Sequence, residues 1–391
     1  MNMAQKIKTR RRLWHGLSAA TALLILTACT KDGDTIYMPN PDEPQPSTAP
    51  LVTVIHNVDA LGDRSYNDLI YQGVEKTAHQ YGLRTMQLSP TSYEEGLAYL
   101  QTIFQGVSTT QGDTTRQLFI ICATGYDDYV RQNAHLFAEN PYADLLYLET
   151  TEPLPEGCGS TLYLPYYGAM YEVATMVPIT DRDALIVASN PEDLTVAGAV
   201  KGFNDGFLAD YYDIDEEYIV GEGDEQETIN YPKRIGTIYL AEHAGEGYNV
   251  PDTTLINRLF KEPIKEFDFT LEPILIPICG GTGSTLNYLM NILGAYHYVG
   301  VDVDVISPDC RFSCLKHIDR AVGLCIRQWL SPEGMPRHQV LGLASGYTGV
   351  AVHFHEDIYF EDYFNSIITA EVRQQIHEDA IRKEEEYEKC K

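Results

Sequence analysis

The chain has 391 residues, 44% of them hydrophobic, and carries 28 basic against 56 acidic side chains, a formal net charge of −28. Because single hydrophobic cores stop growing at about 250–300 residues, this length predicts two lobes or domains. A chain this acidic repels phosphate backbones and anionic lipid, so nucleic acid is not an expected partner.

The N-terminus predicts the cellular compartment. A basic segment over residues 6–12 precedes an apolar run over 17–28, which is too short for a membrane-spanning helix and ends on Leu26-Thr27-Ala28-Cys29. This ending resembles the lipobox of bacterial lipoproteins. The resemblance implies a signal peptide over residues 1–28 and lipidation of Cys29. We therefore expect a protein of the bacterial cell envelope, tethered to the inner or outer membrane by its lipid alone and facing the periplasm. The alternative is an ordinary secretory signal with a chance cysteine.

Residues 29–50 predict a disordered tether. Prolines recur there among polar residues, and such a composition cannot bury enough apolar surface to fold. The folded body is expected to begin near Leu51.

The cysteines predict no disulfide framework. Of the 8 in the chain, Cys29 would carry the lipid, and the others are an odd number in irregular spacing. Cys310, Cys314 and His317 could be read as metal ligands, but no fourth ligand stands in a suitable spacing. Buried free thiols are the preferred interpretation, and no metal is expected.

From Leu51 onward, strand patterns alternate with helix patterns. Expected strands over 51–58, 84–90, 117–125 and 144–150 are separated by expected helices over 66–82, 92–104 and 126–141, where Ser92 and Glu95 predict a capping box. The pattern restarts after 161–177, with strands over 183–189, 234–240 and 296–305, helices over 196–211 and 255–267, and a glycine turn at 279–283 after an apolar run. This alternation predicts an α/β fold whose parallel sheets are covered on both faces. The C-terminal residues 368–391 predict a charged, largely solvated helix.

Small and polar residues follow the expected strands. Ligands of open α/β sheets bind outside the carboxyl ends of the strands. The groups at those ends are Asp63 with Tyr66 and Asn67, Tyr126 with Asp127, Gly280 with Gly281, Asp302, and Gly346. Carboxylates, amides and aromatic rings suit a neutral, polyhydroxylated ligand with a flat ring.

Five segments in order, DRSYNDLIYQG, PICGGTGSTLNYLM, YVGVDVDV, SCLKHIDRAV and VLGLASGYTGVAV, resemble the basic membrane protein family of lipoproteins. Characterised members of that family are purine nucleoside receptors of ABC transporters. The resemblance spans residues 51–380. It implies a type I periplasmic-binding-protein fold: two Rossmann-like lobes joined by a three-stranded hinge, with nucleoside enclosed between them. We place the hinge crossings near residues 164, 313 and 336, giving an N-terminal lobe of 51–164 and 314–335 and a C-terminal lobe of 165–313 and 336–391.

The resemblance also implies roles for individual residues. Tyr66 would stack on the base, Asn67 would read its edge, and Asp302 would hold the ribose hydroxyls with Lys316 nearby. Gly280 and Gly281 would allow close backbone approach to the ligand. Where many relatives carry a second aromatic residue before the glycine turn, this chain has Ile276. The second ring would then be absent or supplied by another residue, such as Tyr126 or Tyr347.

These features predict a monomeric receptor that captures a purine nucleoside and delivers it to an ABC permease, without a cofactor. A receptor or sensor for a sugar or other small polar ligand on the same scaffold is the alternative. An exported nucleoside hydrolase is less favoured, because the sequence contains no catalytic Gly-x-Ser-x-Gly or His-Glu-x-x-His motif. His353 and His355 alternate on one strand face and could chelate a metal, although solvated partners of Glu356 and Asp357 are the preferred interpretation.

Overall fold

The computed structural model describes residues 48–109, 115–212, 217–220, 227–241, 247–248, 250, 267, 269, 271–293 and 297–391. Cys29 and most of the tether lie outside the described residues, as does the expected helix over 255–267 apart from Phe267. Within the described part of the chain, no helix is both long and apolar enough to cross a membrane.

The first lobe is built on a parallel sheet with the strand order β13-β5-β4-β3-β1-β2. Its strands are β1 (Leu51–Ile55), β2 (Arg84–Leu88), β3 (Gln117–Ile121), β4 (Ala143–Leu148), β5 (Ser160–Tyr163) and β13 (His338–Val340). The central strands read as nearly continuous buried apolar runs, as expected for a sheet covered on both faces.

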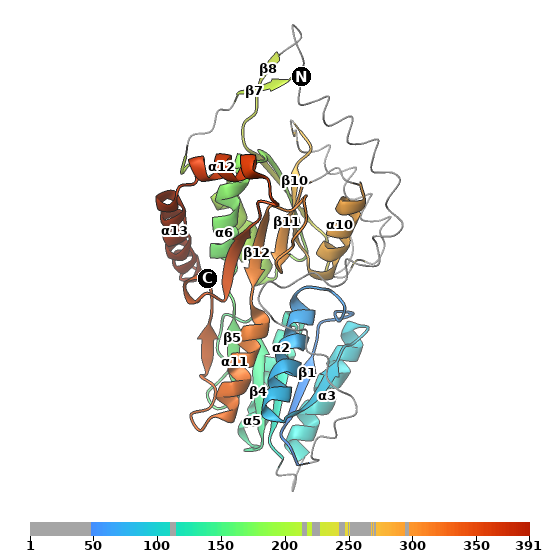
Figure 1. The fold of residues 1–391 in the computed structure, drawn as a ribbon. Coiled ribbons are helices and arrows are strands. Elements are labelled where there is room, and N and C mark those ends of the chain that lie inside the picture. Colours follow the sequence, from blue (N-terminus) through green and yellow to red (C-terminus); the bar gives the residue numbers. More distant parts are fainter. Residues whose placement is uncertain are drawn as a thin grey trace. The chain divides into compact units, whose positions relative to one another are not determined.

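Helices cover both faces of this sheet. They are α2 (Tyr66–Tyr81), α3 (Tyr93–Thr109), α4 (Asp127–Asn133), α5 (His135–Ala138) and α11 (Ile318–Leu330), and η2 (Thr124–Tyr126) is a short 3₁₀ turn. Figure 1 shows α2 and α11 side by side, although they lie far apart in the sequence. Gly73 permits this contact, because a Cβ there would lie 2.4 Å from the carbonyl oxygen of Asp319.

The ends of α2 and α3 explain where these helices begin and stop. Gly82, at φ 64°, ends α2 in the left-handed region that glycine tolerates. At the start of α3 the Oγ of Ser92 accepts the amide of Glu95 at 3.1 Å, as predicted. The Glu95 carboxylate, however, binds the amide of Thr91 instead of that of Ser92, so the capping box is only half formed.

The second lobe contains two three-stranded sheets that meet edge to edge. In the first, β6 (Asp183–Ala188) lies between β9 (Arg234–Tyr239) and β10 (Ile274–Ile278), and all are parallel. In the second, β12 (Phe312–Lys316) lies between β11 (Val299–Asp302) and the antiparallel β14 (Thr348–Val352). A parallel bridge between Leu275 and Tyr298 joins the two sheets, so the lobe has a continuous mixed sheet. A separate antiparallel pair is formed by β7 (Glu217–Val220) and β8 (Glu227–Asn230).

The helices of this lobe are α6 (Tyr167–Met176), α7 (Leu194–Phe207), α10 (Gly280–Leu293), α12 (Ile358–Ile367) and α13 (Ala370–Glu388), with 3₁₀ turns η3 (Val177–Ile179) and η6 (Leu343–Ser345). Gly202 and Gly206 let α7 approach α6 closely, since a Cβ on either would lie 2.2 Å from a carbonyl oxygen of α6. The predicted C-terminal helix is confirmed as α13, which packs beside α6 (Figure 1) and buries Ile376, Ala380 and Glu384.

The chain passes between the sheets of the two lobes three times. The first passage, between Tyr163 and Tyr167, falls where residue 164 was expected. The other two fall later than the expected 313 and 336. Because β12 pairs with β11 and β14, the second passage follows Lys316, and because β13 pairs with β5, the third follows Val340. By strand pairing, these two passages lie a few residues later in the chain than expected.

The cysteines of the described body are all free thiols. Cys122, Cys158, Cys279, Cys310, Cys314 and Cys325 are buried, and Cys390 is exposed. The interpretation of the cysteines as buried free thiols therefore holds for all of these except Cys390. Among the described residues no cluster of three or more His, Cys, Asp or Glu side chains could hold a metal ion.

Candidate functional site

A cavity lies at the carboxyl ends of the strands of both lobes, and the empty space in it and at its open mouth is about 730 Å³. Asn57 follows β1, Thr124 follows β3, Glu149 follows β4, and Asp302 ends β11. Parallel strands bring their carboxyl ends to one edge of a sheet, so residues from distant loops meet there.

Most of the predicted site residues line this cavity. They are Asp63, Tyr66, Asn67, Gly280, Gly281, Asp302 and Lys316. The remaining three lie elsewhere. Tyr126 is buried under Tyr93 with ring centroids 5.0 Å apart, Asp127 pairs with Arg131, and Gly346 ends η6 at φ 69°.

The cavity also contains residues that the sequence did not single out: Asn57, Thr124, Glu149, Tyr166, Asp193, Thr195 and Tyr248. Glu149 stood at the end of an expected strand, the same signal that identified Asp302. Asp193 caps α7 through the amides of Thr195 and Val196, which an Asp just before a helical pattern could have indicated. Tyr248 follows β9 in a stretch where no element was expected, so no local pattern pointed to it.

Asp63 organises the start of α2. One carboxylate oxygen accepts the amides of Ser65 and Asp68, and the other accepts the backbone amide and the side-chain Nδ2 of Asn67. Burial raises the pKa of Asp63, while these hydrogen bonds act in the opposite direction. Because both oxygens are occupied, the carboxylate orients Asn67 and has little remaining capacity to accept from a ligand.

A buried ion pair forms one wall. The Nζ of Lys316 lies 2.7 Å from Oε1 of Glu149, and both side chains are almost completely buried. Burial raises the pKa of Glu149, and the Lys316 ammonium opposes that rise. Lys316 also lies 5.2 Å from the ring centroid of Tyr66, whose buried hydroxyl has no hydrogen-bond partner among the described residues.

Two cavity residues have uncommon backbone conformations. Glu149 has φ 57° and Asp302 has φ 68°, both in the left-handed region that non-glycine residues rarely adopt. Such conformations persist where surrounding contacts hold them, and they concentrate at functional sites. The fold therefore holds Glu149 and Asp302 in backbone conformations that cost free energy, and these conformations set the directions of their carboxylates.

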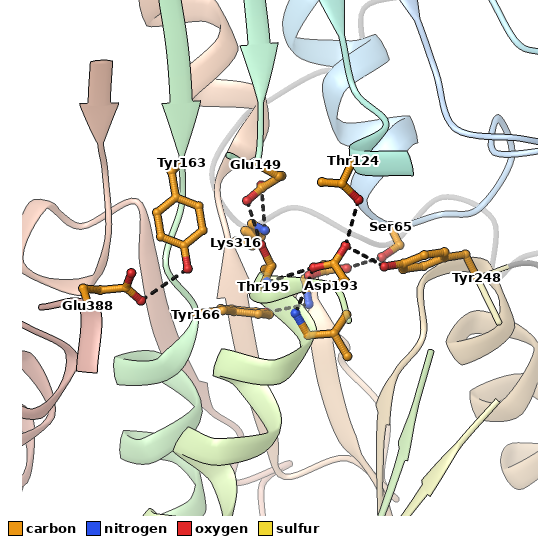
Figure 2. Close-up of polar contacts among 12 residues, drawn as sticks. Ser65, Thr124, Glu149, Tyr163, Tyr166, Asp193, Thr195, Tyr248, Lys316 and Glu388 are labelled. Atoms are coloured by element: carbon orange, nitrogen blue, oxygen red, sulfur yellow. Dashed lines mark hydrogen bonds and ion pairs between the residues drawn. The ribbon is translucent and has the colours of Figure 1, made fainter. Parts of the chain in front are cut away.

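Hydroxyl groups bind carboxylates across the cavity, as Figure 2 shows. Thr124 of the first lobe donates to Asp193 of the second at 3.2 Å, and Thr195 of the second donates to Glu149 of the first at 3.1 Å. Ser65 donates to Asp302 at 2.5 Å. These bonds connect the two lobes directly at the cavity.

An aromatic side chain from the second lobe completes the wall. The hydroxyl of Tyr248 donates to Oδ2 of Asp193 at 2.7 Å (Figure 2), and its carbonyl accepts the amide of Thr282 at 3.0 Å. A Cβ at Gly280, which has φ 54°, would lie 3.4 Å from that carbonyl. Ile276 is buried in the core of its lobe, and neither it nor Tyr347 lines the cavity.

The paired histidines lie outside the cavity. The Nε2 of His353 is 2.5 Å from Asp304, and the Nε2 of His355 is 2.9 Å from the carbonyl oxygen of Cys310. Each ring therefore has its own protein partner, different from the Glu356 and Asp357 that were expected.

No protein-family model matches the chain, and no curated protein matches its sequence. Solved structures do match. An ABC transporter solute-binding protein from Aeropyrum pernix K1 has a TM-score of 0.56 at 15% identity, over 86% of each chain. A transcriptional activator of the comK gene from Bacillus halodurans has a TM-score of 0.57 at 13% identity, over 85% of this chain and 96% of that one. A solute-binding protein from Conexibacter woesei DSM 14684 has a TM-score of 0.52 at 13% identity, over the same shares.

These similarities, together with the strand order, show that the chain has the predicted type I periplasmic-binding-protein fold. At such low identity they establish the fold and not the ligand. The one fold is shared by a transport protein and a transcriptional activator, so function must be argued from the cavity.

Proposed function

We propose that this protein is a lipid-anchored solute-binding receptor that captures a purine nucleoside between its lobes for uptake by an ABC permease. The observation that carries the proposal is the cavity in which carboxylates and tyrosine rings from both lobes converge. Hydroxyl groups of a sugar and the face of a base are the ligand features that such walls complement.

The charge of the cavity supports an uncharged ligand. Asp63, Glu149, Asp193 and Asp302 line it together with Lys316, which is already paired with Glu149. A phosphate or carboxylate group would be repelled by this excess of negative charge, whereas hydroxyls can donate to it. A nucleoside therefore fits the walls better than a nucleotide.

Asp302 is the proposed acceptor for the ribose hydroxyls. Ser65 occupies its Oδ2, and Oδ1 has no hydrogen-bond partner among the described residues. A carboxylate oxygen accepts well from a hydroxyl, and the bond is strong when water is excluded. The position of Asp302 in the cavity wall supports this role.

Tyr66 and Tyr248 are the proposed aromatic walls for the base. The ring of Tyr66 lines the cavity, and its centroid lies 5.2 Å from the Nζ of Lys316. Tyr248 would supply the second ring that was expected from Tyr126 or Tyr347. Its hydroxyl bond to Asp193 fixes its position beside the glycine turn.

A sugar receptor on the same scaffold remains the second candidate, because the carboxylates and hydroxyl groups of the cavity would also suit a monosaccharide. A thermal-shift panel on the mature protein separates the two. Inosine, guanosine and adenosine at millimolar concentration should raise the melting temperature by mass action, and ribose alone should not. Stabilisation by ribose or glucose, with no effect of any nucleoside, would exclude the nucleoside proposal. Incubation of the protein with a nucleoside tests the hydrolase alternative, because release of free base would indicate an enzyme.

The anchor is tested separately. Replacement Cys29→Ser removes the thiol that would carry the lipid. In cells labelled with a radioactive fatty acid, the native protein should incorporate label and sediment with membranes. The variant should incorporate none, and an unchanged distribution would contradict lipidation at this position.

A further inference from the structure

Tyr166 occupies a central position that the proposed ligand contacts do not explain. It lies in the first passage between the lobes, after β5 and before α6, and it is buried with 2% of its surface exposed. Its hydroxyl accepts the amide of Asp302 at 2.9 Å and donates to the carbonyl oxygen of Cys314 at 2.8 Å. A single hydroxyl thus satisfies one backbone donor and one backbone acceptor on neighbouring strands.

The hydrogen bond from the Asp302 amide to Tyr166 lies at a residue with an unfavourable backbone conformation. Asp302 is the last residue of β11 and has left-handed φ, which is unfavourable for a residue with a Cβ. The turn to positive φ sets the direction in which its carboxylate leaves the strand. An amide held at this point therefore fixes the side chain as well as the backbone.

The second partner of the hydroxyl ties this arrangement to the hinge. Cys314 belongs to β12, two residues before Lys316 at the second passage between the lobes. The ring of Tyr166, in the first passage, lies 5.4 Å from the Nζ of Lys316, the residue that directly precedes the second. Burial and the nearby Cys314 and Asp302 hold the pKa of Tyr166 well above its usual range, so the hydroxyl keeps its proton at physiological pH.

We propose that Tyr166 is a positioning residue that holds Asp302 in its left-handed conformation and thereby aims the Asp302 carboxylate into the cavity. Its contribution to binding rests on the proposed ligand function, whereas its effect on the Asp302 backbone does not. Two measurements can therefore be made independently.

The first measurement needs no ligand. Backbone amide hydrogen exchange at Asp302 is compared in the native protein, in Tyr166→Phe and in Tyr171→Phe. Tyr171 is a matched control: it is equally buried, it lies on α6, and its hydroxyl bonds to Tyr211 at 2.9 Å and not to the site. Exchange at Asp302 should become at least about tenfold faster in Tyr166→Phe and stay unchanged in the control. Unchanged exchange in Tyr166→Phe would overturn the proposal.

The second measurement is a double-mutant cycle on nucleoside affinity by calorimetry. Tyr166→Phe should raise the Kd about tenfold in the native background, the effect of losing one ordinary hydrogen bond. In the background Asp302→Gly, which keeps the left-handed backbone but lacks the carboxylate, Tyr166→Phe should change the Kd less than twofold. Equal losses in both backgrounds would show that Tyr166 contacts the ligand itself and would overturn the positioning role. If the native protein binds no nucleoside, the proposed function fails and the exchange measurement alone decides the role of Tyr166.

Discussion

The carboxylates that line the cavity have different tasks. Asp63 uses both oxygens on the first turn of α2, Asp193 caps α7, and Glu149 neutralises Lys316. Asp302 has an oxygen that no described residue occupies. The hydrogen-bond capacity left over at each side chain, and not its mere presence in the wall, indicates which of them can bind a ligand.

Asp302→Ala should weaken ribonucleoside binding by about two orders of magnitude, because each charge-assisted hydrogen bond to a hydroxyl contributes roughly 1.5–3 kcal/mol. The fold should persist, since the residue lies at a strand end. Calorimetry with a ribonucleoside and its 2′-deoxy analogue provides the control: the analogue should lose less from the substitution. Equal losses for the two ligands would mean that Asp302 does not bind the 2′-hydroxyl.

Lys316→Met should lower the free energy of unfolding by about 3–5 kcal/mol, because it leaves Glu149 buried without its counter-charge. The double variant Glu149→Gln, Lys316→Met should recover a large part of that loss, since no uncompensated charge remains. Urea unfolding of the three proteins measures both effects. A double variant no more stable than Lys316→Met would show that the lost packing, and not the lost charge, is responsible.

At the scale of elements, helix α13 makes hydrogen bonds to segments next to the passages between the lobes. Its Glu384 accepts the amide of Gly168 at the start of α6 and the amide of Leu343 in η6, directly after the first and third passages between the lobes. Near the end of the helix, the hydroxyl of Tyr163 at the end of β5 donates to Glu388 at 3.2 Å (Figure 2). A helix expected to be mostly solvated therefore contacts both lobes through its buried face.

Burial raises the pKa of Glu384 from 4.5 to about 7. A carboxyl group whose pKa is raised by folding favours the folded state most when it is protonated, and this contribution is lost as the pH rises through the folded pKa. The free energy of unfolding should therefore fall between about pH 4.5 and pH 7, by about 3 kcal/mol from this group.

Glu384→Gln should flatten that part of the stability curve, because the amide does not titrate. Glu385→Gln is the matched control: it is the next residue of the same helix, and its side chain is 62% exposed. Urea unfolding at several pH values between 4.5 and 8 measures the slope. A slope as steep in Glu384→Gln as in the control would assign the pH dependence to another group.

At the scale of the whole molecule, the hydroxyl–carboxylate bonds of Ser65, Thr124 and Thr195 link the lobes around the cavity. Each bond is modest, and we expect the three together to favour a closed arrangement before any ligand enters. A receptor whose closed state is already populated loses less affinity to the closing step.

The triple variant Ser65→Ala, Thr124→Val, Thr195→Val should shift the unliganded protein toward an open arrangement with a larger radius of gyration. Affinity should fall in proportion to the lost closed fraction. Small-angle scattering with and without ligand measures the shift. Thr102→Val is the control, since this exposed hydroxyl bonds only within α3. Identical scattering curves for triple variant and control would rule out closure by these bonds.

The sequence predicted the α/β alternation and most helix and strand positions, because hydrophobic periodicity and helix ends are local properties. Strand ends such as Asp302 and the segment from Asp63 to Asn67 could be identified as site candidates for the same reason. The start of α2, the glycine turn and the end of β11 all reach the cavity.

Only the tertiary structure determines which strand ends lie next to each other. Tyr126 follows a strand just as Thr124 does, yet it points under Tyr93, while Tyr248 reaches the cavity from a stretch without a local pattern. The hinge passages after Lys316 and Val340 depend on which strands pair. Strand order, register and the close approach of Tyr166 to Asp302 join residues far apart in the chain, and a local pattern carries no information about such contacts.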